Sequence, residues 1–130
     1  MSSQLDAILR DYVAAWNEPD DVARVRRLEA CVVDDVRMVP GYKPDAPPVR
    51  GRDELSAEIG VMVASRPAGG KYRLALVGEP DAHHGWARFR WRVADPAGAP
   101  LTIGGMAVTG LDVVQVADDG RLETIVVFLG

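Results

Sequence analysis

Hydrophobic residues recur at three- and four-residue steps through much of the first half of the chain, which is the pattern of helices with one apolar face. Prolines, glycines and an acidic helix start divide this half into separate elements. The elements predicted here are, in order, a helix over residues 4–17 stopped by Pro19, a helix over 20–33, a strand over 36–39, a loop over 40–51, and a helix capped by Asp53 and closed by Pro67.

The pattern changes to an alternation of apolar and polar residues in the second half, which indicates half-buried strands. The predicted elements are a strand over residues 71–79, a turn over 80–85, a strand over 87–93, a turn over 95–98, a long strand to Val116 that bends at Gly104 and Gly105, and a strand over 122–129. Helices come first and strands last, so the expected class is α+β, with helices on one face of a mostly antiparallel sheet.

Composition and charge narrow the function classes. The 130 residues, of which 48% are hydrophobic and 26% charged, fit one globular domain over 1–130. A chain with a net charge of −4 has little electrostatic attraction for phosphate groups, so we expect neither nucleic-acid nor membrane binding. No apolar run approaches the ~18 residues that cross a membrane. The N-terminal residues lack the features of a secretory signal, and the lone cysteine cannot form an intramolecular disulfide, so we expect a cytoplasmic protein.

Side chains typical of metal and nucleophile sites are sparse. His83 and His84 adjoin in an expected turn and fit a solvated hairpin better than a metal site, because no metal-binding spacing accompanies them. Cys31 lies among apolar residues, where a thiol behaves as a small hydrophobic group rather than a nucleophile.

No glycine-rich phosphate loop is present, so we expect no cofactor. One strand face carries three arginines, Arg88, Arg90 and Arg92. They could bind an anion, but a solvated or subunit-facing surface is the simpler interpretation.

Asp112 is the most informative polar residue. Strand periodicity places it on the same face as Val108, Val114 and Val116. A carboxyl among apolar neighbours must be hydrogen-bonded or protonated, and a neutral carboxylic acid can donate a proton to a substrate oxygen. In the alternative, the strand slips near Gly110 and Asp112 is simply solvated.

Tyr12 lies on the inward stripe of the first helix, where its hydroxyl needs a partner. Asp112 is one candidate, and the alternative is a core tyrosine whose hydroxyl reaches water or backbone. If the core holds a cavity, large apolar side chains must line it. Those expected to do so are Trp16, Met38, Phe89, Trp91, Ile125 and Leu129.

Several short motifs, mostly at helix ends and turns, carry a resemblance to a known family. They are YVAAWN at 12–17, DDV at 34–36, GRDEL at 51–55, LD at 111–112, DGRL at 119–122 and FLG at 128–130. With the order of elements, they resemble the nuclear transport factor 2-like superfamily, in its SnoaL-like polyketide cyclase and ketosteroid-isomerase-like branch. The resemblance implies a conical domain with three N-terminal helices on a strongly curved sheet, a deep apolar pocket, and a homodimer.

The resemblance also implies roles for particular residues. Tyr12 and Asp112 fall on the two positions that stabilise the enolate oxygen in ketosteroid isomerases, whereas Pro40 falls where the proton-transferring base belongs. SnoaL-like cyclases resemble a scheme with one principal acid/base aspartate, which Asp112 could supply. We therefore expect a cofactor-independent isomerase or cyclase acting on a hydrophobic carbonyl compound. The alternatives are a noncatalytic binding or dimerisation module, motivated by Pro40, and a core without a cavity.

Overall fold

The three expected helices are present in the computed structural model, which describes residues 3–67 and 70–130. They are α1 (Ser3–Ala15), α2 (Asp21–Cys31) and α3 (Arg52–Ser65). Asp20 caps α2, because its Oδ2 accepts a hydrogen bond from the Ala23 amide at 2.8 Å. The expected cap of α3 is wrong: Gly51 holds that position at φ 86°, and Asp53 lies in the first turn, where its charge favours the helix dipole.

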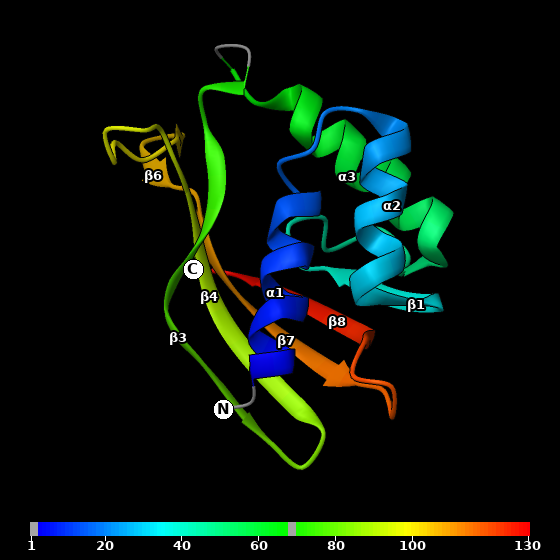
Figure 1. Cartoon of the computed structure of the whole chain (residues 1–130). Coiled ribbons are helices and arrows are strands. Elements are labelled where there is room, and N and C mark those ends of the chain that lie inside the picture. The colour runs from blue at the N-terminus through cyan, green and yellow to red at the C-terminus, as the bar shows by residue number, and fades with distance from the viewer. Residues whose placement is uncertain (1–2, 68–69) are drawn as a thin grey trace.

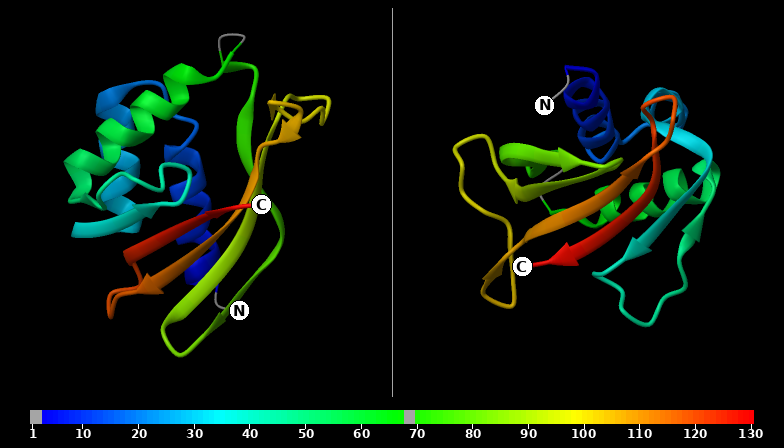
Figure 2. Two further views of the ribbon diagram at one scale, coloured as in Figure 1. Left: turned by 180° about the vertical axis from the view of Figure 1, so that it is seen from behind. Right: turned by 90° about the horizontal axis from the view of Figure 1, so that it is seen from below.

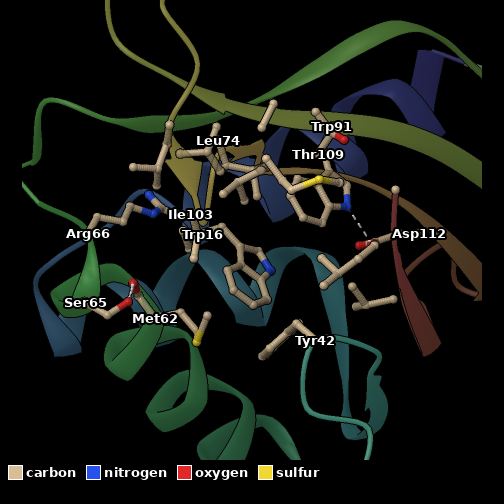
Figure 3. A pocket seen from close by; sticks show the side chains of 18 of the residues that line it. Trp16, Tyr42, Met62, Ser65, Arg66, Leu74, Trp91, Ile103, Thr109 and Asp112 are labelled. Atoms are coloured by element: carbon tan, nitrogen blue, oxygen red, sulfur yellow. Dashed lines mark hydrogen bonds between the residues drawn. The ribbon is translucent and has the colours of Figure 1, made fainter.

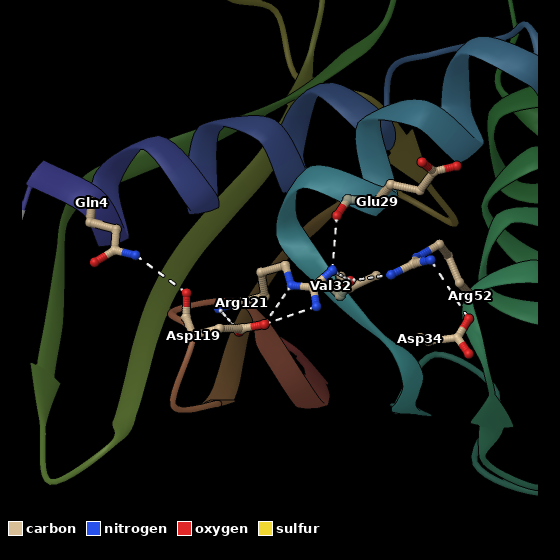
Figure 4. Close-up of polar contacts among 7 residues, drawn as sticks. All are labelled: Gln4, Glu29, Val32, Asp34, Arg52, Asp119 and Arg121. Carbon is tan, nitrogen blue, oxygen red and sulfur yellow. Dashed lines mark hydrogen bonds and ion pairs between the residues drawn. The ribbon is translucent and has the colours of Figure 1, made fainter.

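Strand β1 (Val32–Pro40) begins immediately after α2 and is longer than expected. The prediction that the second helix reaches residue 33 is wrong because Val32 already has extended backbone angles. Two arginines hold this junction, since Arg52 Nη2 and Arg121 Nη1 both donate to the Val32 carbonyl, at 2.9 and 3.5 Å (Figure 4). The loop that follows contributes the short strand β2 (Val49–Arg50) beside β1.

The next hairpin is formed by β3 (Arg73–His83) and β4 (Trp86–Ala94). The turn expected over 80–85 is shorter than predicted, because it contains only His84 and Gly85, with φ values of 52° and 79°. Residues 80–83 continue β3 after an irregularity in register between Val77 and Asp81. An edge strand tolerates the proline of this segment, since no further strand needs its missing amide hydrogen.

The long strand expected up to Val116 is interrupted. A separate small hairpin, β5 (Thr102–Ile103) and β6 (Met106–Ala107), turns at Gly104 and Gly105, both of which have positive φ. The bend is therefore a reversal of the chain rather than a kink within one strand. Strand β7 (Thr109–Val116) then returns to the main sheet and leads to β8 (Leu122–Leu129).

The main sheet has the strand order β2-β1-β8-β7-β4-β3, and every neighbouring pair is antiparallel except β1 and β8. It curves strongly around the helical layer on its inner face (Figures 1 and 2). This confirms the α+β class and the conical arrangement. No helix in the described part of the chain combines the length and apolar character needed to cross a membrane.

Candidate functional site

An apolar cavity of about 850 Å³ lies between the helices and the inner face of the sheet. Its wall includes six of the residues singled out from the sequence: Tyr12, Trp16, Phe89, Trp91, Asp112 and Leu129. Tyr12 comes from helix α1, Trp16 directly follows that helix, and strands β4, β7 and β8 supply the rest. The cavity extends to the small hairpin of β5 and β6, since Thr102, Ile103, Met106 and Ala107 belong to its wall.

Two residues expected to line the cavity lie elsewhere. Met38 and Ile125 pair across β1 and β8 and are fully buried in the core, outside the cavity wall. Helices α2 and α3 pack directly against β1 here, so no space remains over these side chains. Two residues further along β8, Val127 does line the cavity. The apolar alternation of the strand identified the inner face correctly but not how far along it the helices extend.

Asp112 points into the cavity from β7, with its side chain almost completely buried (Figure 3). Its Oδ1 accepts a hydrogen bond of 2.8 Å from the indole Nε1 of Trp91 on the neighbouring strand. No other hydrogen bond to this carboxyl forms within the described residues, and it is the only side-chain carboxyl in the described wall. Burial raises the pKa of Asp112 from 3.8 to about 7, while the indole hydrogen bond acts in the opposite direction.

Gly110 explains how Trp91 reaches Asp112. The two residues pair directly across β4 and β7, two positions from the carboxyl. A Cβ atom at position 110 would overlap the Trp91 ring and lie 2.6 Å from the carbonyl oxygen of Phe128. Because glycine lacks that atom, the indole can lie flat over the strand and extend its N–H toward Asp112.

Tyr12 faces the cavity from α1 and is almost inaccessible. Its ring makes edge contacts with Trp16 and Phe89, at centroid distances of 6.4 Å each. No hydrogen bond of good geometry satisfies the hydroxyl among the described residues. Burial raises the pKa of Tyr12 well above 10, and the charge of Asp112 adds to the rise, so the phenol stays protonated and able to donate. The Trp16 side chain acts on this hydroxyl and lowers its pKa, by less than burial raises it.

Among the polar residues of the cavity wall that the sequence reasoning missed are Tyr42 and Arg66. Tyr42 lies in the proline-rich loop, and its hydroxyl donates to Glu58 Oε2 at 2.8 Å. Arg66, directly after α3, extends its guanidinium toward the cavity and donates to Asn17 Oδ1 at 3.0 Å (Figure 3). The one signal in the sequence was that Tyr42 and Lys43 are neighbours in the same loop. No comparable signal marked Arg66. Which loop side chains face inward depends on tertiary packing.

The other candidates examined from the sequence lie away from this cavity. His83 and His84 are at the tip of the β3–β4 hairpin, and no group of three potential metal ligands gathers within the described residues. Cys31 is fully buried, and burial raises its pKa to about 12, so its thiol is protonated at neutral pH. The arginine stripe of β4 is exposed on the outer face of the sheet, where Arg88 forms an ion pair with Asp81 at 3.0 Å.

A curved sheet wrapped around helices, with one buried carboxyl facing an apolar cavity, defines an α+β domain built around an internal pocket. Its fold matches the crystal structure of a SnoaL-like family protein from Agrobacterium tumefaciens str. C58, described as a candidate isomerase, with a TM-score of 0.79 and 30% identity over 99% of each chain. The chain therefore belongs to the SnoaL-like family.

A second solved structure supports the fold alone. It is a protein of unknown function with a cystatin-like fold from Methylobium petroleophilum PM1, which matches with a TM-score of 0.70 at 16% identity. The match covers 100% of this chain and 78% of the other. No family model matches the sequence, and no curated protein does.

Proposed function

We propose that this chain is a cofactor-independent enzyme that isomerises or cyclises a hydrophobic carbonyl compound by proton transfer. The observation that carries the proposal is that Asp112 is the one side-chain carboxyl that the described residues place in the apolar cavity wall, where burial raises its pKa to about 7. A general acid or base works best when its pKa lies near the working pH. Asp112 moves the proton in this proposal.

Tyr12 is the hydrogen-bond donor to the carbonyl or enolate oxygen. Its buried hydroxyl faces the cavity and makes no hydrogen bond of good geometry among the described residues, so a substrate oxygen would satisfy it. A preorganised donor lowers the barrier because it stabilises negative charge that develops on that oxygen. The apolar walls, including Phe89 and Trp91, hold the body of the substrate and exclude water.

The test follows exchange of carbon-bound hydrogen, which needs no knowledge of the natural product. The hydrophobic ketone 2-tetralone is incubated in deuterated water, and NMR follows loss of its α-protons. We expect acceleration over buffer by the wild-type protein, loss of about 10²-fold or more in Asp112→Asn, and a smaller loss in Tyr12→Phe. Asp119→Asn, which changes an exposed acid outside the cavity, is the matched control and should match the wild type.

A second candidate function is noncatalytic binding of a hydrophobic small molecule. It is favoured by Pro40, which is buried at the end of β1 beside Val127, where a carboxylate would be needed for a second proton-transfer group. Under this alternative, 2-tetralone binds without any accelerated exchange, and Asp112→Asn leaves its affinity nearly intact.

We also propose a homodimer that forms through the outer face of the sheet. An apolar row crosses that face, in which Leu111 pairs with Phe128, and Val113 pairs with Val126. Phe128 is 52% exposed, which is unusual for a large aromatic side chain unless something covers it. Sedimentation equilibrium should show a dimer that Phe128→Glu dissociates and that Val22→Glu, at an exposed position on α2 away from the outer face of the sheet, does not. A wild-type monomer at micromolar concentration would contradict the proposal.

A further inference from the structure

Arg66 places a positive charge on the opposite side of the cavity from Asp112 (Figure 3). The side chain is half-buried, and its one hydrogen bond within the described residues goes from Nη1 to Asn17 Oδ1 at 3.0 Å. No carboxylate of the described residues forms an ion pair with it. A guanidinium carries five N–H donors, so most of this one remains available.

Asn17 fixes the guanidinium in place. Its Oδ1 also accepts from the Leu74 amide at 2.8 Å, and its Nδ2 donates to the Leu74 carbonyl at 2.8 Å. These two bonds to β3 hold the Asn17 amide in one orientation, so its oxygen presents a fixed acceptor to Arg66. A ligand that meets Arg66 therefore meets a cation that is already oriented.

Among the described residues, no neighbouring charge serves as a counter-ion for Arg66. Lys43, also in the cavity wall, is neutralised by Glu58 at 2.9 Å. Asp112 lies across the cavity (Figure 3), and none of the ion pairs among the described residues joins it to Arg66. Burial lowers the pKa of Arg66, and the charge of Arg73 adds to that effect, so the surroundings disfavour the cation as it stands. A negative group on a ligand would offset this.

We propose that Arg66 binds the carboxylate of an amphipathic monocarboxylic acid, whose apolar body fills the cavity and extends toward Asp112. This inference rests on the proposed function and names the substrate class for the same pocket. One unpaired guanidinium balances one negative charge and can pair with both oxygens of a carboxylate. The walls between Arg66 and Asp112 are apolar, among them Trp16, Leu74 and Ile103, which suits a hydrocarbon body.

The experiment uses the neutral dye N-phenyl-1-naphthylamine to report cavity occupancy by its fluorescence. Decanoate and 1-decanol, which differ in the head group, compete for the dye at pH 7.5. The wild type should bind decanoate more tightly than decanol, and Arg66→Gln should lower that preference about tenfold or more. Arg66→Lys should restore part of it, because it keeps the charge without the planar geometry. Arg26→Gln, at an exposed position on α2 outside the cavity wall, should behave as wild type.

Three other outcomes overturn the inference, and a fourth affects only the proposed catalysis. Equal affinity of the wild-type protein for decanoate and decanol would show that the pocket does not select an anion. An equal loss of affinity for both competitors in Arg66→Gln would show that Arg66 only ties α3 to Asn17. If the wild type failed to bind the dye at all, the pocket itself and the proposed function would fall together. If dye binding and decanoate preference held while 2-tetralone showed no exchange, only catalysis would be lost.

Discussion

Two opposing influences set how readily Asp112 holds its proton. Removal from water disfavours the carboxylate, and the Trp91 indole favours it by donating a hydrogen bond. The first is larger, so the carboxyl titrates near neutral pH instead of near 4. Proton transfer in both directions then becomes accessible under ordinary conditions.

Asp112 should make the folded protein less stable as the pH rises. The carboxyl ionises at about 4 in the unfolded chain but at about 7 in the folded one. The native state therefore keeps its proton longer, and stability falls between these two values and is constant above them. The full difference corresponds to roughly 4 kcal/mol.

Urea unfolding at pH 4.5 and pH 8 checks this expectation. Asp112→Asn has no proton to lose and should show a clearly smaller fall across the interval. Asp119→Asn should keep the wild-type fall, because the pKa of exposed Asp119 is lowered rather than raised. An identical fall in wild type and Asp112→Asn would mean that Asp112 ionises normally in the folded state.

Replacement of Trp91 by phenylalanine should raise the pKa of Asp112 further. Phenylalanine keeps an apolar ring over Gly110 but cannot donate, so the carboxylate loses its hydrogen bond. Carboxyl-resolved NMR titration measures the shift directly. Trp16→Phe is the control, since Trp16 also lines the cavity but makes no hydrogen bond to Asp112. The pH profile of 2-tetralone exchange should move upward in the Trp91 variant alone.

For individual residues, the sequence predicted that the side chains of Asp112 and Tyr12 face inward, because each stands in a periodic run of apolar residues that fixes its face. The Trp91–Asp112 bond could not be predicted. This bond depends on the register between β4 and β7, which places Gly110 opposite Trp91. The apolar pattern of a strand does not specify which strand it pairs with or in which register. Arg66 was missed for a similar reason, since its acceptor is 49 residues away.

The helices and strands themselves were predicted well where the apolar period was sustained, and less well where glycine or proline marked a change of direction. Residues 80–85 contain turn-forming types, yet most of them belong to β3 because pairing with β4 outweighs local preference. The glycine pair Gly104 and Gly105 is equally compatible with a bend within one strand and with the turn of a hairpin. The two are distinguished only by what the flanking residues pair with.

Arg24 joins the helices in a way that sequence patterns do not reveal. Its guanidinium on α2 is almost fully buried and donates to the carbonyls of Glu18, Pro19 and Ser56, the last on α3. Gly60 lies on α3, and a Cβ atom at this position would lie 2.7 Å from Nη1 of Arg24. Glycine therefore leaves room for the guanidinium beside α3.

Arg24→Met should therefore destabilise the protein by about 3 kcal/mol or more, because it leaves the buried Ser56 carbonyl and the partly buried carbonyls of Glu18 and Pro19 without these donors. Urea unfolding provides the measurement. Arg27→Met, which removes a half-exposed pair with Glu18 on the same helix, should cost under about 1 kcal/mol. Similar losses in the two variants would show that the buried contacts of Arg24 contribute little.

For the molecule as a whole, the cavity is unfilled volume that a larger side chain can occupy. Val108→Trp adds bulk to the cavity wall and should abolish binding of N-phenyl-1-naphthylamine. The unfolding free energy should change by less than about 2 kcal/mol, since the new ring enters existing space. Val77→Trp, on the exposed edge strand, is the matched control and should bind the dye normally. Normal dye binding by Val108→Trp would place the dye elsewhere.

The parallel pairing of β1 with β8 has a consequence for the order of events during synthesis. Met38 and Ile125 lie side by side in the sheet but are made far apart in time on the ribosome. Until residues 122–129 emerge, the edge of β1 that pairs with β8 has no neighbouring strand, and the cavity wall lacks Val127 and Leu129. Contacts this distant in sequence form slowly. The main sheet therefore stays incomplete on the nascent chain until β8 pairs with both β1 and β7.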